Sequence, residues 1–268
     1  MITIITILSI ILYLATAFLL VRRLVSGSSA VKMVRLPCIA LGFGAVILHA
    51  SLLYVGLVTP EGLNLGFFNA LSLVTCLVAL LMLLTAFFQQ IENLGIVVLP
   101  MAAVAILLDE LIPTRHIMIS SQSSELELHI VLSLLAYSLL AIAALQALLL
   151  AVQDRQLRNK HPGGFMRALP PMQTMESLLF QLISGGFILL GLALLTGALY
   201  LEDIFAQHLV HKTALSIVAW LVFGTLLFGR WQFGWRGRTA IRWTIGGFIA
   251  LLLAYFGSKL VLELIIGA

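Results

Sequence analysis

The sequence predicts an all-α membrane helix bundle with about eight transmembrane helices, and three observations lead to this fold class. Only 10% of the 268 residues are charged, whereas soluble domains carry roughly 25% charged residues. The mean hydropathy is +1.14, which excludes an ordinary water-exposed surface. Apolar runs near the roughly 20 residues that cross a ~30 Å hydrocarbon core recur along the whole chain.

Eight apolar runs mark the expected helices, at residues 3–21, 37–57, 66–88, 93–112, 127–152, 177–200, 213–229 and 244–266. Each run must close its own backbone hydrogen bonds as a helix, because the hydrocarbon core offers no water. Arg22 and Arg23 follow the first run where a secretory signal would have a small-residue cleavage site, so we expect a retained helix. A capping-box pattern, Ser124 to Glu127, predicts that the fifth helix begins at Glu125 and that His129 lies one turn inside it.

Lysine and arginine placement predicts the topology. Most of these residues fall in the first, fifth and seventh loops: Arg22, Arg23, Lys32, Arg35, Arg155, Arg158, Lys160, Arg167, Arg230, Arg236, Arg238 and Arg242. The positive-inside rule then makes these loops cytoplasmic and places both termini outside, on the periplasmic side of a bacterial inner membrane. The net charge of +4 is therefore a topology signal, and we expect lipid rather than nucleic acid as the partner of the basic loops.

We expect one integral membrane domain over residues 1–268. Residues 1–153 would hold helices one to five, residues 154–176 a cytoplasmic linker with Pro-Gly-Gly and Pro-Pro elements, and residues 177–268 helices six to eight. Cys38 and Cys76 form no Cys-x-x-Cys pair, which argues against a thiol oxidoreductase. The chain also lacks a phosphate-binding loop and a Rossmann fingerprint. No catalytic residue stands out, and we expect no enzyme activity of the chain's own.

Histidines are the main candidate ligands. His129, His208 and His211 belong to the predicted outer face, and a short helix would place His208 and His211, three residues apart, on one side. Glu125 precedes His129 by one turn, and a carboxylate there could orient the imidazole. His49 lies within the second span, where an ionisable group marks a site or relay. A neutral His49 that bonds a neighbouring helix is the alternative.

The acidic pairs Asp109-Glu110 and Glu202-Asp203 sit at helix ends, where a solvated rim explains them, and neither has the ligand spacing of a calcium loop. We expect no metal site. A cation path would need several inward polar groups, and His49, Asn69 and Gln146 are few, which counts against transport.

The second half of the chain resembles the cytochrome c assembly family of membrane haem-handling proteins, of the CcsA and CcmC type. The resemblance rests on three segments: LELHIVLSLLAYSLLAIAALQALLLAVQDRQL, where a histidine opens a helix before an alanine-tyrosine pair; LISGGFILLGLALLTGALY with its Thr-Gly pair; and the GWRGR loop at 234–238. The first half matches around His49 and the turn at 66–69. The resemblance implies haem as the cofactor and cytochrome assembly proteins as partners.

The same resemblance locates the departures from the family. Its tryptophan-rich haem motif corresponds to LEDIFAQHLVHKT, residues 201–213, which contains no tryptophan. His129 matches the first outer histidine, the second is absent after the last helix, and Phe228 occupies the position of an inner histidine. The chain therefore looks like the divergent YpjD or HemX-like branch. Three readings follow: a haem-binding protein that uses His129 with His208 or His211, an accessory protein without haem, or a transporter accessory.

Overall fold

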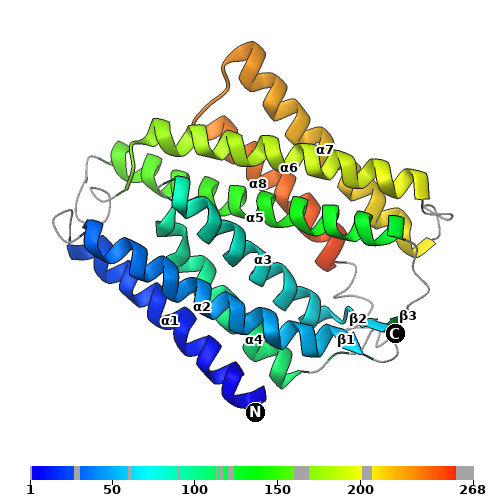
Figure 1. The fold of residues 1–268 in the computed structure, drawn as a ribbon. Coiled ribbons are helices and arrows are strands. Elements are labelled where there is room, and N and C mark those ends of the chain that lie inside the picture. The colour runs from blue at the N-terminus through cyan, green and yellow to red at the C-terminus, as the bar shows by residue number, and fades with distance from the viewer. Residues whose placement is uncertain are drawn as a thin grey trace. The chain divides into compact units, whose positions relative to one another are not determined.

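A computed structural model describes residues 2–26, 31–59, 62–89, 91–112, 114, 117–119, 124–159, 169–200 and 207–257. Within these residues it contains eight helices that are long and apolar enough to cross a membrane (Figure 1). The predicted all-α membrane class is therefore confirmed.

The helices are α1 (Ile2–Ser26), α2 (Val31–Leu57), α3 (Phe67–Phe88), α4 (Gly95–Leu111), α5 (Ser124–Arg158), α6 (Met172–Tyr200), α7 (Gln207–Phe233) and α8 (Arg238–Leu252). A 3-10 turn, η2 (Glu92–Leu94), leads into α4, and a π-helical turn, η4 (Leu253–Gly257), follows α8.

Some helices are longer than their apolar runs. The helix α5 continues to Arg158 and α6 begins at Met172, so both enter the predicted linker 154–176, and α8 begins at Arg238 rather than 244. Hydropathy marks where lipid contact ends, but a helix persists where polar side chains can pair along its surface or extend to the headgroups. Asp154 and Arg158 form such a pair at 2.9 Å. The predicted span beyond Gly257, with Lys259 and Glu263, lies outside the described residues.

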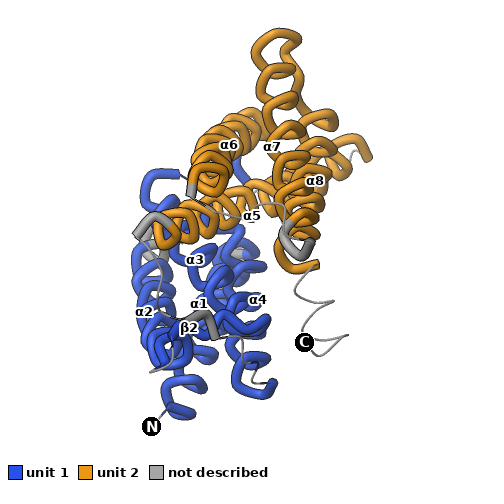
Figure 2. Tube along the Cα trace, turned by 90° about the vertical axis from the view of Figure 1, so that its right-hand side faces the viewer, with its two compact units in different colours: residues 1–120, 160–170 blue, residues 121–159, 171–268 orange. Residues whose placement is uncertain are grey.

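The chain divides into two compact units (Figure 2). Unit 1 comprises residues 1–120 and 160–170, and unit 2 comprises residues 121–159 and 171–268. Each unit therefore holds four of the long helices, and α5 belongs with α6 to α8 rather than with the helices that precede it in sequence. A single integral membrane domain stays a prediction.

In unit 1, α1 packs against α2 and α4, and α3 packs against the same two helices. A small antiparallel sheet of β1 (Val58–Thr59), β2 (Gly62–Asn64) and β3 (Ile117–Ile119) closes one end, with β2 in the middle. We call this the sheet end of unit 1. The sequence analysis predicted no strand here, because two or three residues are too short to show an alternating pattern.

Thr114 joins the sheet end to the helices. Its carbonyl accepts from Asn64 Nδ2 at 3.2 Å, and its Oγ1 accepts from the backbone N–H of Phe68 at 3.3 Å. The chain passes so close to Gly66 that a Cβ there would lie 2.6 Å from the Thr114 carbonyl oxygen. The start of α3 and the residues after α4 are thereby held together.

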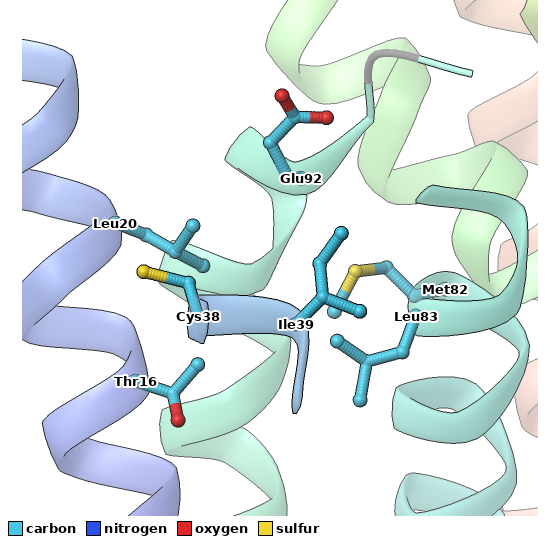
Figure 3. A pocket seen from close by; sticks show the side chains of 7 residues that line it. All are labelled: Thr16, Leu20, Cys38, Ile39, Met82, Leu83 and Glu92. Atoms are coloured by element: carbon cyan, nitrogen blue, oxygen red, sulfur yellow. The ribbon is translucent and has the colours of Figure 1, made fainter. Parts of the chain in front are cut away.

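An ion pair closes the other end of unit 1. Arg23 Nη2 lies 3.0 Å from Glu92 Oε1, and the two side chains are only 12% and 9% exposed. Beside the pair is a cavity of about 10 Å³ whose lining includes Thr16, Cys38 and Met82 (Figure 3). A cavity of this size has room for about one water molecule and none for a porphyrin.

In unit 2, α5 and α6 pack along their lengths, and α8 packs against α5 and α7. Gln146 on α5 is buried and donates to the carbonyl of Met175 at 3.2 Å. Tyr137 on α5 contacts the rings of Phe248, Tyr255 and Phe256, with ring centroids 5.5 to 5.9 Å apart. These contacts hold the end of α8 and the π-helical turn against α5.

The Arg23–Glu92 pair should be a main support of unit 1. Glu92→Gln would leave the Arg23 charge buried without its counter-charge, and we expect a loss of about 3–5 kcal/mol in the free energy of unfolding. Unfolding of the purified protein in detergent would measure the loss. The matched control is Asp154→Asn, because an ion pair with an exposed partner contributes about 0–1 kcal/mol. Equal losses of unfolding free energy in the two variants would show that the Arg23–Glu92 pair is not a main support of unit 1.

Candidate functional site

One ring nitrogen of His129 is hydrogen-bonded, and the other has no partner among the described residues. It lies half-buried on the second turn of α5, and its Nδ1 is 2.9 Å from the carbonyl oxygen of Ala193 and 3.3 Å from Thr196 Oγ1, both on α6. A carbonyl oxygen only accepts, so Nδ1 carries the proton. In the neutral ring the lone pair therefore lies on Nε2, which makes no hydrogen bond within the described residues.

This arrangement is the one that metal-ligating histidines adopt. Such a histidine donates its second ring nitrogen to a carbonyl or carboxylate, which fixes the tautomer and orients the lone pair. The predicted orienting group was Glu125, whose side chain is outside the described residues. Among the described residues the carbonyl of Ala193 orients the ring, and the sequence could not identify this carbonyl because the contact depends on how α6 packs on α5.

The other two outer histidines are only partly described. His211 is exposed in the first turns of α7, and His208 lies one turn earlier on the same helix, with its side chain outside the described residues. The structure therefore confirms a helix at this pair. It gives no contact between either of them and His129. Among the described residues, no group of three or more histidine, cysteine, aspartate and glutamate side chains could hold a metal ion.

His49 differs from His129 because both of its ring nitrogens are bonded. It is 0% exposed, with Nδ1 3.1 Å from the Tyr13 hydroxyl on α1 and Nε2 2.9 Å from Ser72 Oγ on α3. A buried histidine with two partners cannot bind iron unless it gives up one bond. Of the residues predicted to bind haem, His129 thus fits the chemistry and His49 does not fit in this arrangement.

The GWRGR loop forms a compact turn between α7 and α8. Gly234 and Gly237 have φ values of +65° and +58°, which a side chain would disfavour. The Trp235 ring folds back onto Gly229. The Arg230 guanidinium donates to the backbone carbonyl of Trp235 at 3.2 Å. The Glu176 carboxylate on α6 accepts from the Gly237 backbone N–H. The motif thus fixes the ends of α6, α7 and α8 together.

Phe228, which the resemblance places at the position of an inner histidine, is 54% exposed and lies among aromatic rings. Its ring centroid is 6.2 Å from those of Trp231 and Phe233. Since aromatic side chains gather at membrane interfaces, this cluster is suited to lipid contact rather than ligation.

Sequence reasoning missed a row of polar side chains on α1. Thr6, Ser9, Tyr13 and Thr16 are at most 4% exposed and follow one another at three- and four-residue spacing. They share one face of the helix, the face that points into unit 1. Their three- and four-residue spacing could have indicated this face. It is not apparent from hydropathy, because hydroxyl residues hardly lower the mean hydropathy of an apolar run.

Comparisons with known proteins identify the family of the chain. The family model described as Cytochrome C assembly protein matches residues 39–266. The chain is 37% identical over 231 residues to "Inner membrane protein YpjD" of Escherichia coli (strain K12), and the match covers 85% of each chain. It is 26% identical over 175 residues to "Cytochrome c biogenesis protein CcsA" of Synechococcus sp. (strain CC9902), a match that covers 57% of this chain and 58% of the relative. No solved structure matches.

The bond between Tyr13 and His49 should stabilise unit 1. Tyr13→Phe would leave His49 Nδ1 buried without a partner, and we expect the free energy of unfolding to fall by about 1–3 kcal/mol. The control is Tyr54→Phe, which removes the same hydroxyl from a side chain that is 70% exposed. Thermal unfolding of both variants in one detergent would make the comparison, and an unchanged Tyr13→Phe variant would argue against a strong bond.

The turn between α7 and α8 should not tolerate a side chain at Gly229. A Cβ there would lie 2.3 Å from Trp235 Cε3, so Gly229→Ala must displace the indole, and we expect a loss of about 1–3 kcal/mol. At Gly246, by contrast, a Cβ would meet nothing within 4 Å. Gly246→Ala should therefore stabilise the helix by about 0.5–1 kcal/mol. Unfolding measurements on the pair would show opposite signs.

Proposed function

The chain belongs to the cytochrome c assembly protein family, and we propose that it is a haem-handling membrane protein in which His129 supplies an iron ligand. The eight apolar helices of its described residues and its likeness to an inner membrane protein make it a multi-pass protein of that membrane. The apolar outer faces of these helices contact lipid. The proposal assigns the chain a binding role and no catalytic reaction of its own.

One observation carries the proposal: the Nδ1–H of His129 is used by the Ala193 carbonyl at 2.9 Å. The hydrogen bond leaves the Nε2 lone pair for a ligand and increases its donor strength. Thr196 Oγ1 accepts from the same N–H at 3.3 Å and donates its own proton to carbonyls on α6. The imidazole is thus oriented before any ligand arrives, which reduces the entropy that binding must remove.

Haem iron would supply the Lewis acid that this nitrogen binds. We propose that His211 or His208, on the first turns of α7, provides the second axial ligand, because both belong to the segment 201–213, which by resemblance corresponds to the family's haem platform. Since this segment lacks tryptophan, hydrogen-bonded or ligating side chains would have to replace the aromatic face. The relative named for cytochrome c biogenesis, CcsA, supports a role in the same process.

An absorption spectrum of the detergent-purified protein, expressed with ample haem or titrated with haemin, tests the proposal. We expect a Soret band in the parent that disappears or shifts in His129→Ala. Loss of a ligand's hydrogen-bond partner already costs about 10- to 100-fold in metal affinity, so removal of the axial nitrogen should lower the affinity for haemin by at least that factor.

His49→Gln is the matched control. Glutamine keeps one donor and one acceptor for Tyr13 and Ser72, so the haem spectrum should not change. A Soret band that survives in His129→Ala but is lost in His49→Gln would place the iron at His49 in unit 1 and contradict the proposal. No band in any of the proteins would leave the second candidate function, an accessory membrane protein without haem, which the tryptophan-free segment favours.

A further inference from the structure

Three exposed arginines lie at the turn between α7 and α8. Arg236 lies within the turn, and Arg238 and Arg242 lie in the first two turns of α8. None of the three side chains forms a hydrogen bond or an ion pair with another described residue. Residues 207–257, which hold both helices, contain no aspartate or glutamate. The positive charge at this turn is therefore not neutralised by its own two helices.

The Glu176 carboxylate on α6 contacts this turn, but it is buried and already used. Its side chain belongs to a residue that is 8% exposed, and it accepts from the Gly237 backbone N–H. Arg230 is used in a similar way, since its guanidinium lies 4.6 Å from the centre of the Phe180 ring and donates to the Trp235 carbonyl. These two charged groups build the turn, whereas the three exposed arginines take no part in holding it.

The backbone fixes the three arginines relative to one another. Arg238 and Arg242 are four residues apart on α8, so they share one face of the helix. Arg236 precedes this helix by two residues, in the compact turn described above. The Trp235 ring lies 5.4 Å from the Trp243 ring, and this contact joins the turn to α8. A ligand would therefore meet three guanidinium groups that are carried by a preformed backbone.

The turn lies at the edge of two membrane spans. The span that includes α7 ends at Phe233, and the span that includes α8 begins at Arg238. Trp231 and Phe233 are 80% and 65% exposed, and exposed aromatic side chains gather where the hydrocarbon meets the lipid headgroups. The three arginines are therefore at the depth of the lipid phosphates, while the exposed rings beside them can contact the acyl chains.

We propose that Arg236, Arg238 and Arg242 bind the headgroup of an anionic phospholipid, and that they favour a lipid with two phosphate groups, of the cardiolipin class. A guanidinium group donates two parallel N–H bonds to phosphate oxygens, which suits arginine to this ligand. One phosphate balances one of the three positive charges, whereas two phosphates balance two. The lipid thus fits the turn in the number of its charges as well as in their sign.

This site is more specific than the general attraction of basic loops to lipid. Arg23 and Arg158, which belong to two other basic loops, are paired with Glu92 and Asp154. Arg155 on α5 is exposed and has no partner within the described ranges, but Asp154 precedes it and lowers the local positive charge. In the described part of unit 2, the turn between α7 and α8 is thus where three unpaired arginines occur together.

Tryptophan fluorescence of the full chain in phosphatidylcholine bilayers tests the site. Three of the four tryptophans lie in or beside the turn, namely Trp231, Trp235 and Trp243. A lipid with brominated acyl chains quenches their emission when it binds there, and the dependence on its fraction in the bilayer gives its relative affinity. At equal bromine content we expect brominated cardiolipin to quench most, brominated phosphatidylglycerol less and brominated phosphatidylcholine least.

A variant with Arg236→Gln, Arg238→Gln and Arg242→Gln should lose affinity for cardiolipin by about 100-fold, because each arginine near an anionic surface contributes a factor of about five. Its unfolding temperature in phosphatidylcholine should equal that of the parent, since the three side chains do not hold the turn. The loss would then come from binding and not from misfolding.

Arg155→Gln is the matched control, because it removes one exposed, unpaired arginine of the same unit outside the turn. Its affinity for cardiolipin should stay within about fivefold of the parent's. A parent without preference for anionic lipid would overturn the proposal, and so would a triple variant that keeps the preference or an Arg155→Gln variant that loses as much. Equal quenching by the two anionic lipids would overturn the preference for two phosphates.

Sodium phosphate distinguishes a lipid headgroup from free phosphate as the occupant. It should displace the brominated lipid no more than sodium chloride of equal ionic strength does, and a greater displacement would overturn the lipid assignment. The experiment uses no added haem, and His129 lies at the other end of α5 from the end that carries Arg155 and Arg158. The lipid proposal and the haem proposal can therefore fail independently.

Discussion

The lack of water in the hydrocarbon core is the constraint on which this structure depends. A backbone or side-chain polar group that enters the core must find its partner inside the protein. The eight long helices of the described residues satisfy their own backbone groups, and several buried side chains find a partner inside the protein: Arg23 with Glu92, His49 with Tyr13 and Ser72, and Gln146 with a carbonyl on α6. Each of these contacts joins helices that apolar packing alone would leave free to slide.

The same constraint reverses the usual arrangement of a soluble protein along α1, where large apolar side chains are exposed and hydroxyl side chains are buried. Its exposed positions are large and apolar, for example Ile7, Ile11 and Phe18, and these face lipid. Its buried positions include Ser9, Tyr13 and Thr16. Apolar surface gains little from burial when the solvent is hydrocarbon, whereas hydroxyl groups gain much, and the polar face of α1 therefore becomes the centre of unit 1.

His129 and His49 differ in how many of their ring nitrogens are hydrogen-bonded. His129 lies near a helix end and uses one ring nitrogen, so it keeps a lone pair for a ligand. His49 lies at membrane depth and uses both ring nitrogens in hydrogen bonds, so it has no nitrogen to spare for a ligand. The number of hydrogen bonds that the neighbouring helices offer to each ring thus separates a candidate ligand from a contact that joins helices.

The sequence alone determined the membrane class, the eight spans and the family, because apolar run length and the GWRGR, His129 and Thr-Gly segments are local patterns. It also singled out His49 and left open whether that residue is a relay or a structural contact. Hydropathy could not predict the helix ends at Arg158, Met172 and Arg238, because it indicates where a helix contacts lipid and not where the helix ends. Only the tertiary structure decided which groups meet: Ala193 with His129, Trp235 with Gly229, and Tyr13 and Ser72 with His49. Each of these contacts joins different helices or folds a turn back on its helix, and the pattern of one helix contains no information about the face that its neighbour presents.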